Sequence, residues 1–455
     1  MRRPFPIASF GTVVCVAACG GSAARVADDA QSSAGTAGSV APGGLGGAPD
    51  SIGGAGGRTV AGASAALGGA GTSGASNQSG ASGVSGGSSP TGGSSASGGA
   101  SGRTSDAGGS SIDGTVPNPG VASACSATGA DWCAVLSGGS LLEYTSAIAR
   151  DPQGNLLILG RTQGGLVGSG RGGFDVFIAK YTSNGQLLWV RQYGSELSEI
   201  PGGLAVDSHG DILYGYRQTL SDDVTIAGFL AKLSSTGDPL WTRQLGTDIP
   251  GVAVDDDGNV FFAASNYADP LLAKYSPSGE MLWSKPNFSG DITVNAAGGA
   301  VVTIARPGQD STVGMISADG DLLWSDANAP FQASAYAVDA SSNVFAVGTA
   351  AVRRYSDTGA LVWEAALDHN LFDVNDIAVD ARGHVFVIGM ANDFGKPYFR
   401  AYVAKYSQDG APQGGQELGV EGDFEGFLTV AVDDSQLFIT GPYRSGVFIA
   451  HMSLL

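Results

Sequence analysis

From about residue 120 onward the sequence repeats with a period of roughly forty to fifty-five residues, and this repeat constrains the fold more than any other feature. Each unit opens with an apolar segment that ends in a turn, as in Ala205–Asp207 and Ala378–Asp380. A later apolar segment leads into a second turn, as in Phe177–Gly185, and a Trp follows that turn. Periods of this length are typical of propellers and solenoids, in which each repeat is one supersecondary unit.

The segments within a unit have the composition of β-strands. Val, Ile, Phe, Tyr and Leu fill them, and Asp, Ser, Asn and Gly separate them, so a unit reads as strand, turn, strand, loop, strand, turn, strand. Segments 343–348 and 384–389 are apolar on both faces, as in sheets that are covered on both sides. No segment has a helical period. We therefore expect an all-β propeller of four-stranded antiparallel blades.

The number of units predicts seven blades. The first turns run from Asp151 to Asp433, and the last unit ends at residue 455 without a Trp-bearing strand. One such strand stands before the first unit, at Asp131–Leu136. Pairing it with the C-terminal strand would complete the last blade and remove two open edges. Only the sixth unit departs from the pattern, because it has Gly414 near the place where the first five units carry Trp.

The N-terminus has the pattern of a secretory signal. Two arginines precede an apolar run over 7–18, which is too short to span a bilayer and suits a signal-peptide core. The following Val16–Gly20 resembles the lipobox of bacterial lipoproteins, so we expect a signal peptide over 1–19 and lipid on Cys19. The alternatives are an ordinary secretory signal or, from Arg2 and Arg3, a twin-arginine signal.

Residues 20–120 are Gly, Ser, Ala and Thr with almost no large apolar side chain. Such a segment cannot bury enough surface to offset its backbone entropy, so we expect a disordered linker with an r.m.s. span on the order of 55 Å. The folded domain then covers 121–455. Near its start, Cys125 and Cys133 suit a disulfide in an oxidising compartment, with two free thiols as the alternative.

The chain carries 42 Asp and Glu against 23 Lys and Arg, a formal net charge of -19. Such a polyanion repels nucleic-acid phosphates and anionic membrane surfaces, so we expect contact with a membrane only through the lipid. We expect a monomer in the bacterial cell envelope, at the outer membrane or cell surface. Two cysteines cannot close a zinc site, no phosphate loop is present, and we predict no metal and no cofactor.

The repeat also resembles a known family. Asp175–Ser195 followed by Gly202–Tyr216 is similar to the bacterial SBBP (seven-bladed β-propeller) repeat, and the resemblance extends over about 147–455. It implies the fold and an extracytoplasmic setting, and the family shares no catalytic residues. The Gly-x-Leu-Leu-Trp element also resembles quinoprotein propeller repeats, but the cofactor-site residues of those enzymes are not found here.

Two recurring charged positions have structural interpretations. Asp255–Asn259 has the acidic character of a calcium loop but lacks the Gly and distal Glu of an EF-hand, so we interpret these aspartates as turn formers. A basic residue recurs five positions before the second-turn Gly, and we expect Lys180–Asp151 and Lys232–Asp207 ion pairs within blades. The fourth unit has neither charge, with Asn295 and Met315 instead.

The remaining candidates lie in the loops between strands two and three and between blades, which share one face of a propeller. Aromatic and Arg side chains there suit a glycan or protein ligand: Arg217, Tyr267, Phe394, Tyr398, Tyr443 and Arg444. No catalytic constellation emerges from the sequence. We therefore expect a non-catalytic binding or scaffolding module. The alternatives are a propeller enzyme acting on polysaccharide, as a hydrolase or lyase, and an envelope assembly factor.

Overall fold

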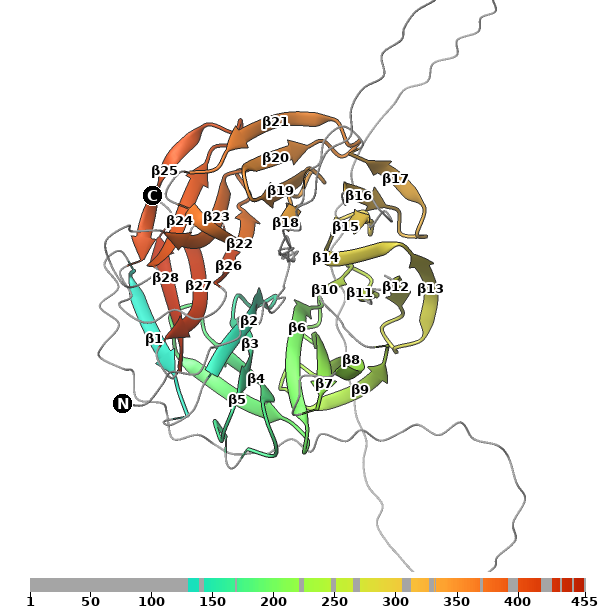
Figure 1. Cartoon of the computed structure of the whole chain (residues 1–455), viewed down its shortest axis with the longest axis vertical. Coiled ribbons are helices and arrows are strands. Elements are labelled where there is room, and N and C mark those ends of the chain that lie inside the picture. The colour runs from blue at the N-terminus through green and yellow to red at the C-terminus, as the bar shows by residue number, and fades with distance from the viewer. Residues whose placement is uncertain are drawn as a thin grey trace, which may run out of the picture. The chain divides into compact units, whose positions relative to one another are not determined.

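The computed structural model describes residues 130–138, 143–167, 170–220, 225–246, 251–264, 271–304, 312–326, 331, 333–368, 371–391, 400–418, 428–433, 436–443 and 446–453. These residues form seven four-stranded antiparallel sheets arranged as blades around a central axis (Figure 1). The expected all-β, seven-bladed propeller is confirmed. The predicted signal peptide, the predicted linker and Cys125 lie outside the described residues.

The first three blades follow the chain in order. Blade 1 consists of β2 (Glu143–Arg150), β3 (Leu156–Thr162), β4 (Asp175–Tyr181) and β5 (Leu187–Tyr193). Blade 2 consists of β6 (Ser198–Val206), β7 (Ile212–Thr219), β8 (Thr225–Leu233) and β9 (Pro239–Gln244). Blade 3 consists of β10 (Gly251–Val254), β11 (Val260–Ala264), β12 (Leu271–Tyr275) and β13 (Met281–Pro286).

The next three blades repeat this order. Blade 4 consists of β14 (Phe288–Val294), β15 (Ala300–Ile304), β16 (Thr312–Ile316) and β17 (Leu322–Ser325). Blade 5 consists of β18 (Ala333–Val338), β19 (Val344–Gly348), β20 (Ala351–Tyr355) and β21 (Leu361–Ala366). Blade 6 consists of β22 (Leu371–Val379), β23 (Val385–Ala391), β24 (Arg400–Tyr406) and β25 (Pro412–Leu418). In each blade the first strand is innermost (Figure 1).

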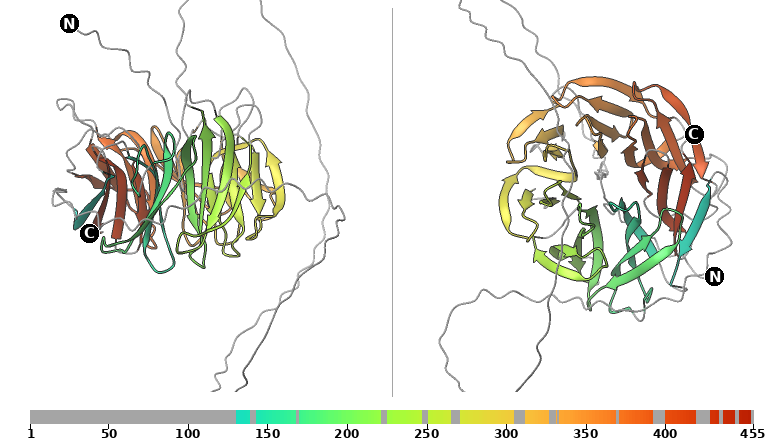
Figure 2. Two further views of the ribbon diagram at one scale, coloured as in Figure 1. Left: turned by 90° about the horizontal axis from the view of Figure 1, so that it is seen from below. Right: turned by 180° about the vertical axis from the view of Figure 1, so that it is seen from behind.

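Blade 7 closes the ring with strands from both ends of the propeller. It combines β26 (Thr429–Val432), β27 (Gln436–Tyr443) and β28 (Gly446–Ser453) with β1 (Trp132–Leu136). The β1 strand pairs antiparallel with β28, with Trp132 opposite His451 and Leu136 opposite Val447. The view from behind shows the same ring (Figure 2, right). The predicted closure is confirmed.

The core lies between blades, in seven clusters. Between blades 1 and 2, Leu157, Leu159 and Val176 pack against Leu204 and Tyr214. A strand in the middle of a blade therefore has a neighbouring sheet on both faces. This is why β19 and β23 are apolar at nearly every position and show no alternation.

The recurring Trp joins the blade that carries it to the next blade. The indole N–H of Trp283 in blade 3 donates to Ala318 O in the second turn of blade 4, at 3.0 Å. Trp324 donates likewise to Asp357 O in blade 5, at 3.0 Å. The second-turn Gly lies against the Trp ring, and at Gly359 a Cβ would be 2.5 Å from Trp324 Cδ2. The same donor and acceptor positions recur for Trp132, Trp241 and Trp363.

This contact explains the departure in the sixth unit. Blade 7 has no second turn, because β28 and β1 come from opposite ends of the propeller sequence. A Trp on β25 would have no second turn to contact, and Gly414 stands there instead, four residues after the second-turn Gly410 as Trp363 follows Gly359. A Cβ on Gly414 would have nothing within 4 Å. The lost Trp is thus a consequence of how the ring closes.

Candidate functional site

The propeller has two faces that carry different connections between strands. Turns between the first and second strands and between the third and fourth strands lie on one face, which we call the first-turn face. The loops between the second and third strands and the connections between blades lie on the opposite face, which we call the loop face. This division follows from the antiparallel order of the strands in every blade.

Aspartates build the turns on the first-turn face. Asp207 Oδ1 accepts the backbone N–H groups of His209 and Asp211, both at 2.9 Å. Asp255 Oδ1 accepts the N–H of Asn259 at 2.8 Å. Hydrogen bonds of this kind fix the chain direction at an Asx turn. The interpretation of these aspartates as turn formers is confirmed.

The second carboxylate oxygen of three of these aspartates holds a buried lysine. The Nζ–Oδ2 distances are 2.8 Å for Lys180–Asp151, 2.8 Å for Lys232–Asp207 and 3.0 Å for Lys274–Asp255. In blade 4 the equivalent positions are neutral, and Asn295 Nδ2 lies 3.6 Å from Met315 Sδ. The predicted ion pairs within blades 1 and 2 are confirmed. Blade 5 differs, because Arg354 donates to Gln408 O of the next blade at 3.1 Å.

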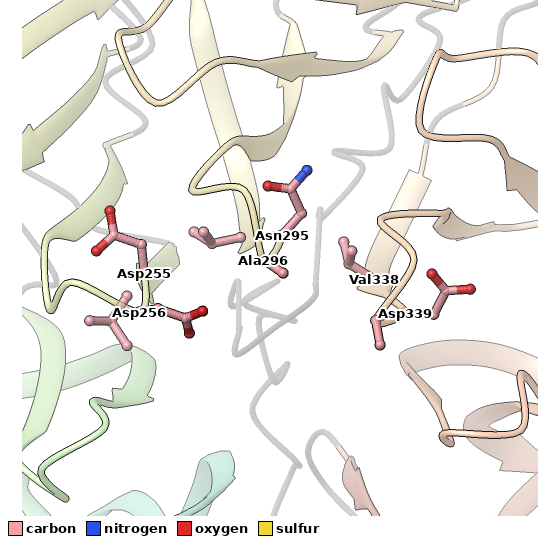
Figure 3. Close-up of a pocket in the computed structure, with 9 residues that line it drawn as sticks. Asp255, Asp256, Asn295, Ala296, Val338 and Asp339 are labelled. Atoms are coloured by element: carbon pink, nitrogen blue, oxygen red, sulfur yellow. The ribbon is translucent and has the colours of Figure 1, made fainter. Parts of the chain in front are cut away.

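A cavity of about 230 Å³ opens between three first turns near the axis (Figure 3). Residues of blades 3, 4 and 5 line it: Val254, Asp255, Asp256, Val294, Asn295, Ala296, Val338, Asp339 and Ala340. Asp255 and Asp339 direct carboxylate oxygens at turn N–H groups, whereas Asp256 is exposed. Sequence reasoning placed the candidate ligand site on the opposite face and treated these aspartates only as turn formers. Within the described ranges, no three His, Cys, Asp or Glu side chains are grouped as a metal site requires.

Of the six residues predicted for a ligand site on the loop face, two lie among the described residues. Arg217 lies in β7, half-buried, between Ile200 of β6 and Gly228 of β8 in the strand register. Tyr443 is the last residue of β27. Tyr267, Phe394, Tyr398 and Arg444 lie outside the described residues. Whether these six side chains form one site stays a prediction.

A buried polar network supports the loop face of blade 1. Gln192 Oε1 accepts the N–H groups of Leu166 and Val167, both at 3.0 Å. Gln192 Nε2 donates to Asp175 Oδ2 at 2.6 Å and to Gly164 O at 2.9 Å. The network therefore ties the loop that follows β3 to the fourth strand. Sequence reasoning missed it, because Gln192 has no counterpart in a known motif.

Two buried glutamates hold the connections between blades. Glu143 Oε1 accepts the N–H of Gly138 at 3.1 Å, and Glu199 Oε2 accepts the N–H of Ser195 at 3.2 Å. Burial raises the pKa of Glu143 to about 7 and raises the pKa of Glu199 as well. Both residues stand eight positions before the turn Asp of their blade. They are positioned to fix the connection that leads into each innermost strand.

The outer strands carry an unusual row of exposed apolar side chains. On blades 2 to 5 these are Leu240, Met281, Leu282, Leu322, Leu323, Leu361 and Val362, each between 51 and 61 % exposed. They follow directly after the second turn and precede the Trp of the same strand, and we call them the apolar arc. Leu188 of blade 1 is exposed at an equivalent place, whereas on β25 Pro412 and Gln413 occupy these places. A pair of exposed apolar side chains that recurs on successive blades differs from the scattered single residues that soluble proteins normally expose.

The described residues contain no helix long and apolar enough to cross a membrane.

Comparison with known proteins identifies a family. A family model described as outer membrane protein assembly factor BamB matches residues 222–451, which is more than half of the chain. No curated protein matches the sequence significantly. Among solved structures, virginiamycin B lyase from Staphylococcus aureus, as a catalytically inactive variant with quinupristin, gives a TM-score of 0.50 at 11 % identity over 71 % of this chain and 99 % of that one.

A chain of the mitotic checkpoint complex is similar to the same extent, with a TM-score of 0.50 at 9 % identity over 70 % of this chain and 94 % of that one. Identities this low show a shared propeller fold and nothing about chemistry.

Proposed function

The chain belongs to the family of outer membrane protein assembly factor BamB, and we propose that its propeller is a non-catalytic protein-binding module of the bacterial cell envelope. The match begins in blade 2 and ends in β28, so it extends over most of the ring. A ring that presents the outer strands of seven blades offers a large surface for non-catalytic binding of a partner.

The apolar arc is the observation that supports this proposal. Seven aliphatic side chains on four successive blades are more than half exposed. Scattered exposed aliphatic residues are normal, but here they recur at the same places of successive repeats. Their exposure to water is unfavourable, and a bound partner that buried them would gain this free energy. A protein partner would bury them best, because aliphatic side chains have few favourable contacts with polar glycans.

The proposal includes the anchor predicted from the sequence. Lipid on Cys19 would hold the chain at the membrane, and the linker over 20–120 would let the propeller reach a partner at a distance. The similarity to the SBBP repeat supports the same extracytoplasmic setting. Labelling cells with a radioactive fatty acid tests the anchor. Label should enter the wild-type chain and not Cys19→Ser, and equal label in both would overturn the anchor.

Site-specific photo-crosslinking in intact cells tests the binding function. A photoreactive amino acid replaces Leu282 or Leu323 on the apolar arc, and Gln413 on β25 provides the matched control on an outer strand. We expect discrete protein adducts from the arc positions and none from Gln413. The absence of adducts at both arc positions would overturn the proposal.

The printed description of the family favours a second candidate function, the assembly of outer membrane proteins. Deletion of the gene should then lower the amounts of other outer membrane proteins, measured by quantitative proteomics of isolated membranes. Restoration by the wild-type chain but not by a variant with Ser at Leu282 and Leu323 would tie this role to the apolar arc. Unchanged amounts of outer membrane proteins after deletion would contradict this assembly role.

A further inference from the structure

We propose that the apolar arc binds a cationic amphipathic segment of a partner protein, in which Lys or Arg side chains accompany aliphatic ones. This inference rests on the proposed protein-binding function and specifies the chemistry of the partner. It is derived from a second feature of the same blades, the charge of the turns that border the arc.

Each of blades 2 to 5 carries an exposed carboxylate beside its part of the apolar arc: Asp238, Glu280, Asp319 and Asp357. Blade 4 carries a second one, Asp321, which lies 3.8 Å from Lys285 Nζ of blade 3 and is left out of this set. Asp238 precedes Leu240 by two residues, and Glu280 is adjacent to Met281. Within the described ranges, none of these four carboxylates forms an ion pair. They are thus available to a cation from outside the propeller, unlike the turn aspartates that hold buried lysines.

The combination is confined to this part of the ring. Blade 1 has Leu188 exposed, but its second turn, Thr182–Gln186, contains no carboxylate. Blade 6 has Asp409 in its second turn, but its outer strand has no aliphatic side chain beside that turn. Blade 7 has no second turn. Among the residues that the structure describes, acid and apolar groups therefore coincide on these four successive blades alone.

Charge complementarity selects the partner chemistry. An acidic or neutral apolar surface would leave the four carboxylates desolvated without compensation, which costs free energy. A segment with cations at matching places would bury the aliphatic side chains and pair the carboxylates at the edge of the contact, where they contribute to specificity and association rate. The net charge of -19 adds a long-range attraction for the same segment.

Fluorescence anisotropy with the mature chain tests the proposal, using a synthetic peptide built only of Leu and Lys and its Leu–Glu counterpart. The Leu–Lys peptide should bind and the Leu–Glu peptide should not. Leu282→Ser, Leu323→Ser and Val362→Ser combined leave the net charge unchanged and should weaken binding about tenfold or more. Gln413→Ser with Gln416→Ser on β25 is the control and should leave affinity unchanged.

A charge-matched pair of variants separates a local contact from general attraction. Glu280→Gln with Asp357→Asn should weaken binding about threefold or more at low salt, because two rim pairs are lost. Glu196→Gln with Asp257→Asn removes the same charge from exposed sites outside the arc and should have a smaller effect. Equal losses in the two variants, or no binding of the Leu–Lys peptide, would overturn the proposal.

Two further outcomes are distinguishable. If arc positions still form crosslinks in cells while the peptide does not bind, the protein-binding function stands and the cationic partner is wrong. If sedimentation shows a dimer that the triple Ser variant dissociates, a second copy of the chain occupies the arc, and the proposal is again overturned.

Discussion

Lys232 Nζ, from the third strand of blade 2, lies 2.8 Å from Asp207 Oδ2 in the first turn of the same blade. Both side chains are almost completely buried. Asp207 Oδ1 meanwhile accepts two turn N–H groups. One carboxylate therefore shapes the turn and pairs with the lysine, which Asp211 Oδ2 also contacts at 3.2 Å. The same arrangement recurs at Asp151 and Asp255.

We predict that this pair is strongly coupled. Lys232→Met should lower the free energy of unfolding by about 3 to 5 kcal/mol, because it leaves the buried Asp207 carboxylate without a cation. Asp207→Asn alone should cost less, because Asp211 Oδ2 still lies 3.2 Å from Lys232 Nζ. The double variant should lose less than the sum, since it approximates the Asn295 and Met315 pair of blade 4. Urea unfolding of the four proteins measures the coupling, and additive losses would contradict it.

The contact between Trp and the second-turn Gly gives a second prediction. Gly359 has a φ of 84°, and its Cβ position is 2.5 Å from Trp324 Cδ2. Gly359→Ala should lower stability by about 2 to 5 kcal/mol, from the strained backbone together with overpacking against the ring. Gly414→Ala is the matched control, because it has a φ of 92° and open space.

The control should therefore lose only about 1 to 2 kcal/mol, the cost of the left-handed backbone. Thermal unfolding of both variants under the same conditions makes the comparison. Equal losses would mean that the Trp ring moves aside and that the contact does not hold adjacent blades together.

Glu143 predicts a pH dependence of stability. Burial raises its pKa from 4.5 to about 7 in the folded state, so the folded chain binds more protons than the unfolded chain between these values. The stabilisation from this group is complete below pH 4.5 and is lost as the pH rises through 7.

Glu143→Gln keeps an acceptor for the Gly138 N–H and cannot ionise, so it should gain stability relative to the wild type as the pH rises from about 5 to 8. Melting temperatures of both proteins across this range measure the effect. Glu196→Gln, at an exposed site, is the control and should follow the wild-type curve. Parallel curves for Glu143→Gln would show that the carboxylate is ionised throughout.

The closing strand gives the fourth prediction. Cys133 lies in β1 opposite Ala450 and is disulfide-bonded. We predict Cys125 as its partner, which lies outside the described residues. Peptide mapping without reduction should find the two linked, and reduction should lower stability by about 2 to 3 kcal/mol through the released loop entropy. A free thiol at Cys125 would contradict the pairing.

The fold could be predicted from the sequence because the repeat contains its own boundaries. Turn residues such as Asp151 and Gly185 mark every unit, and the unused strand around Trp132 shows how the ring closes. The ion pairs within blades could also be predicted, because the antiparallel strand order brings Lys232 back to the turn at Asp207. Both inferences use only local pattern and strand direction.

The surfaces could not be predicted in the same way. Leu240 and Leu282 lie in apolar segments that the sequence pattern does not distinguish from buried strands. The exposure along β9 and β13 depends on which residues the neighbouring blade covers. The cavity at Asp256 likewise depends on three turns meeting near the axis. Such features arise from distances between separate repeats.

By itself, the sequence determined the blade count, the strand order and the turn chemistry, because period and polarity act along the chain. Only the tertiary structure explains why Gly414 stands where the other units have Trp. A ring closed by strands from both ends has no second turn in blade 7, so the Trp contact made by earlier blades has no partner there. It also decided which apolar residues stay exposed, because burial is set by neighbouring blades and not by the strand that carries them.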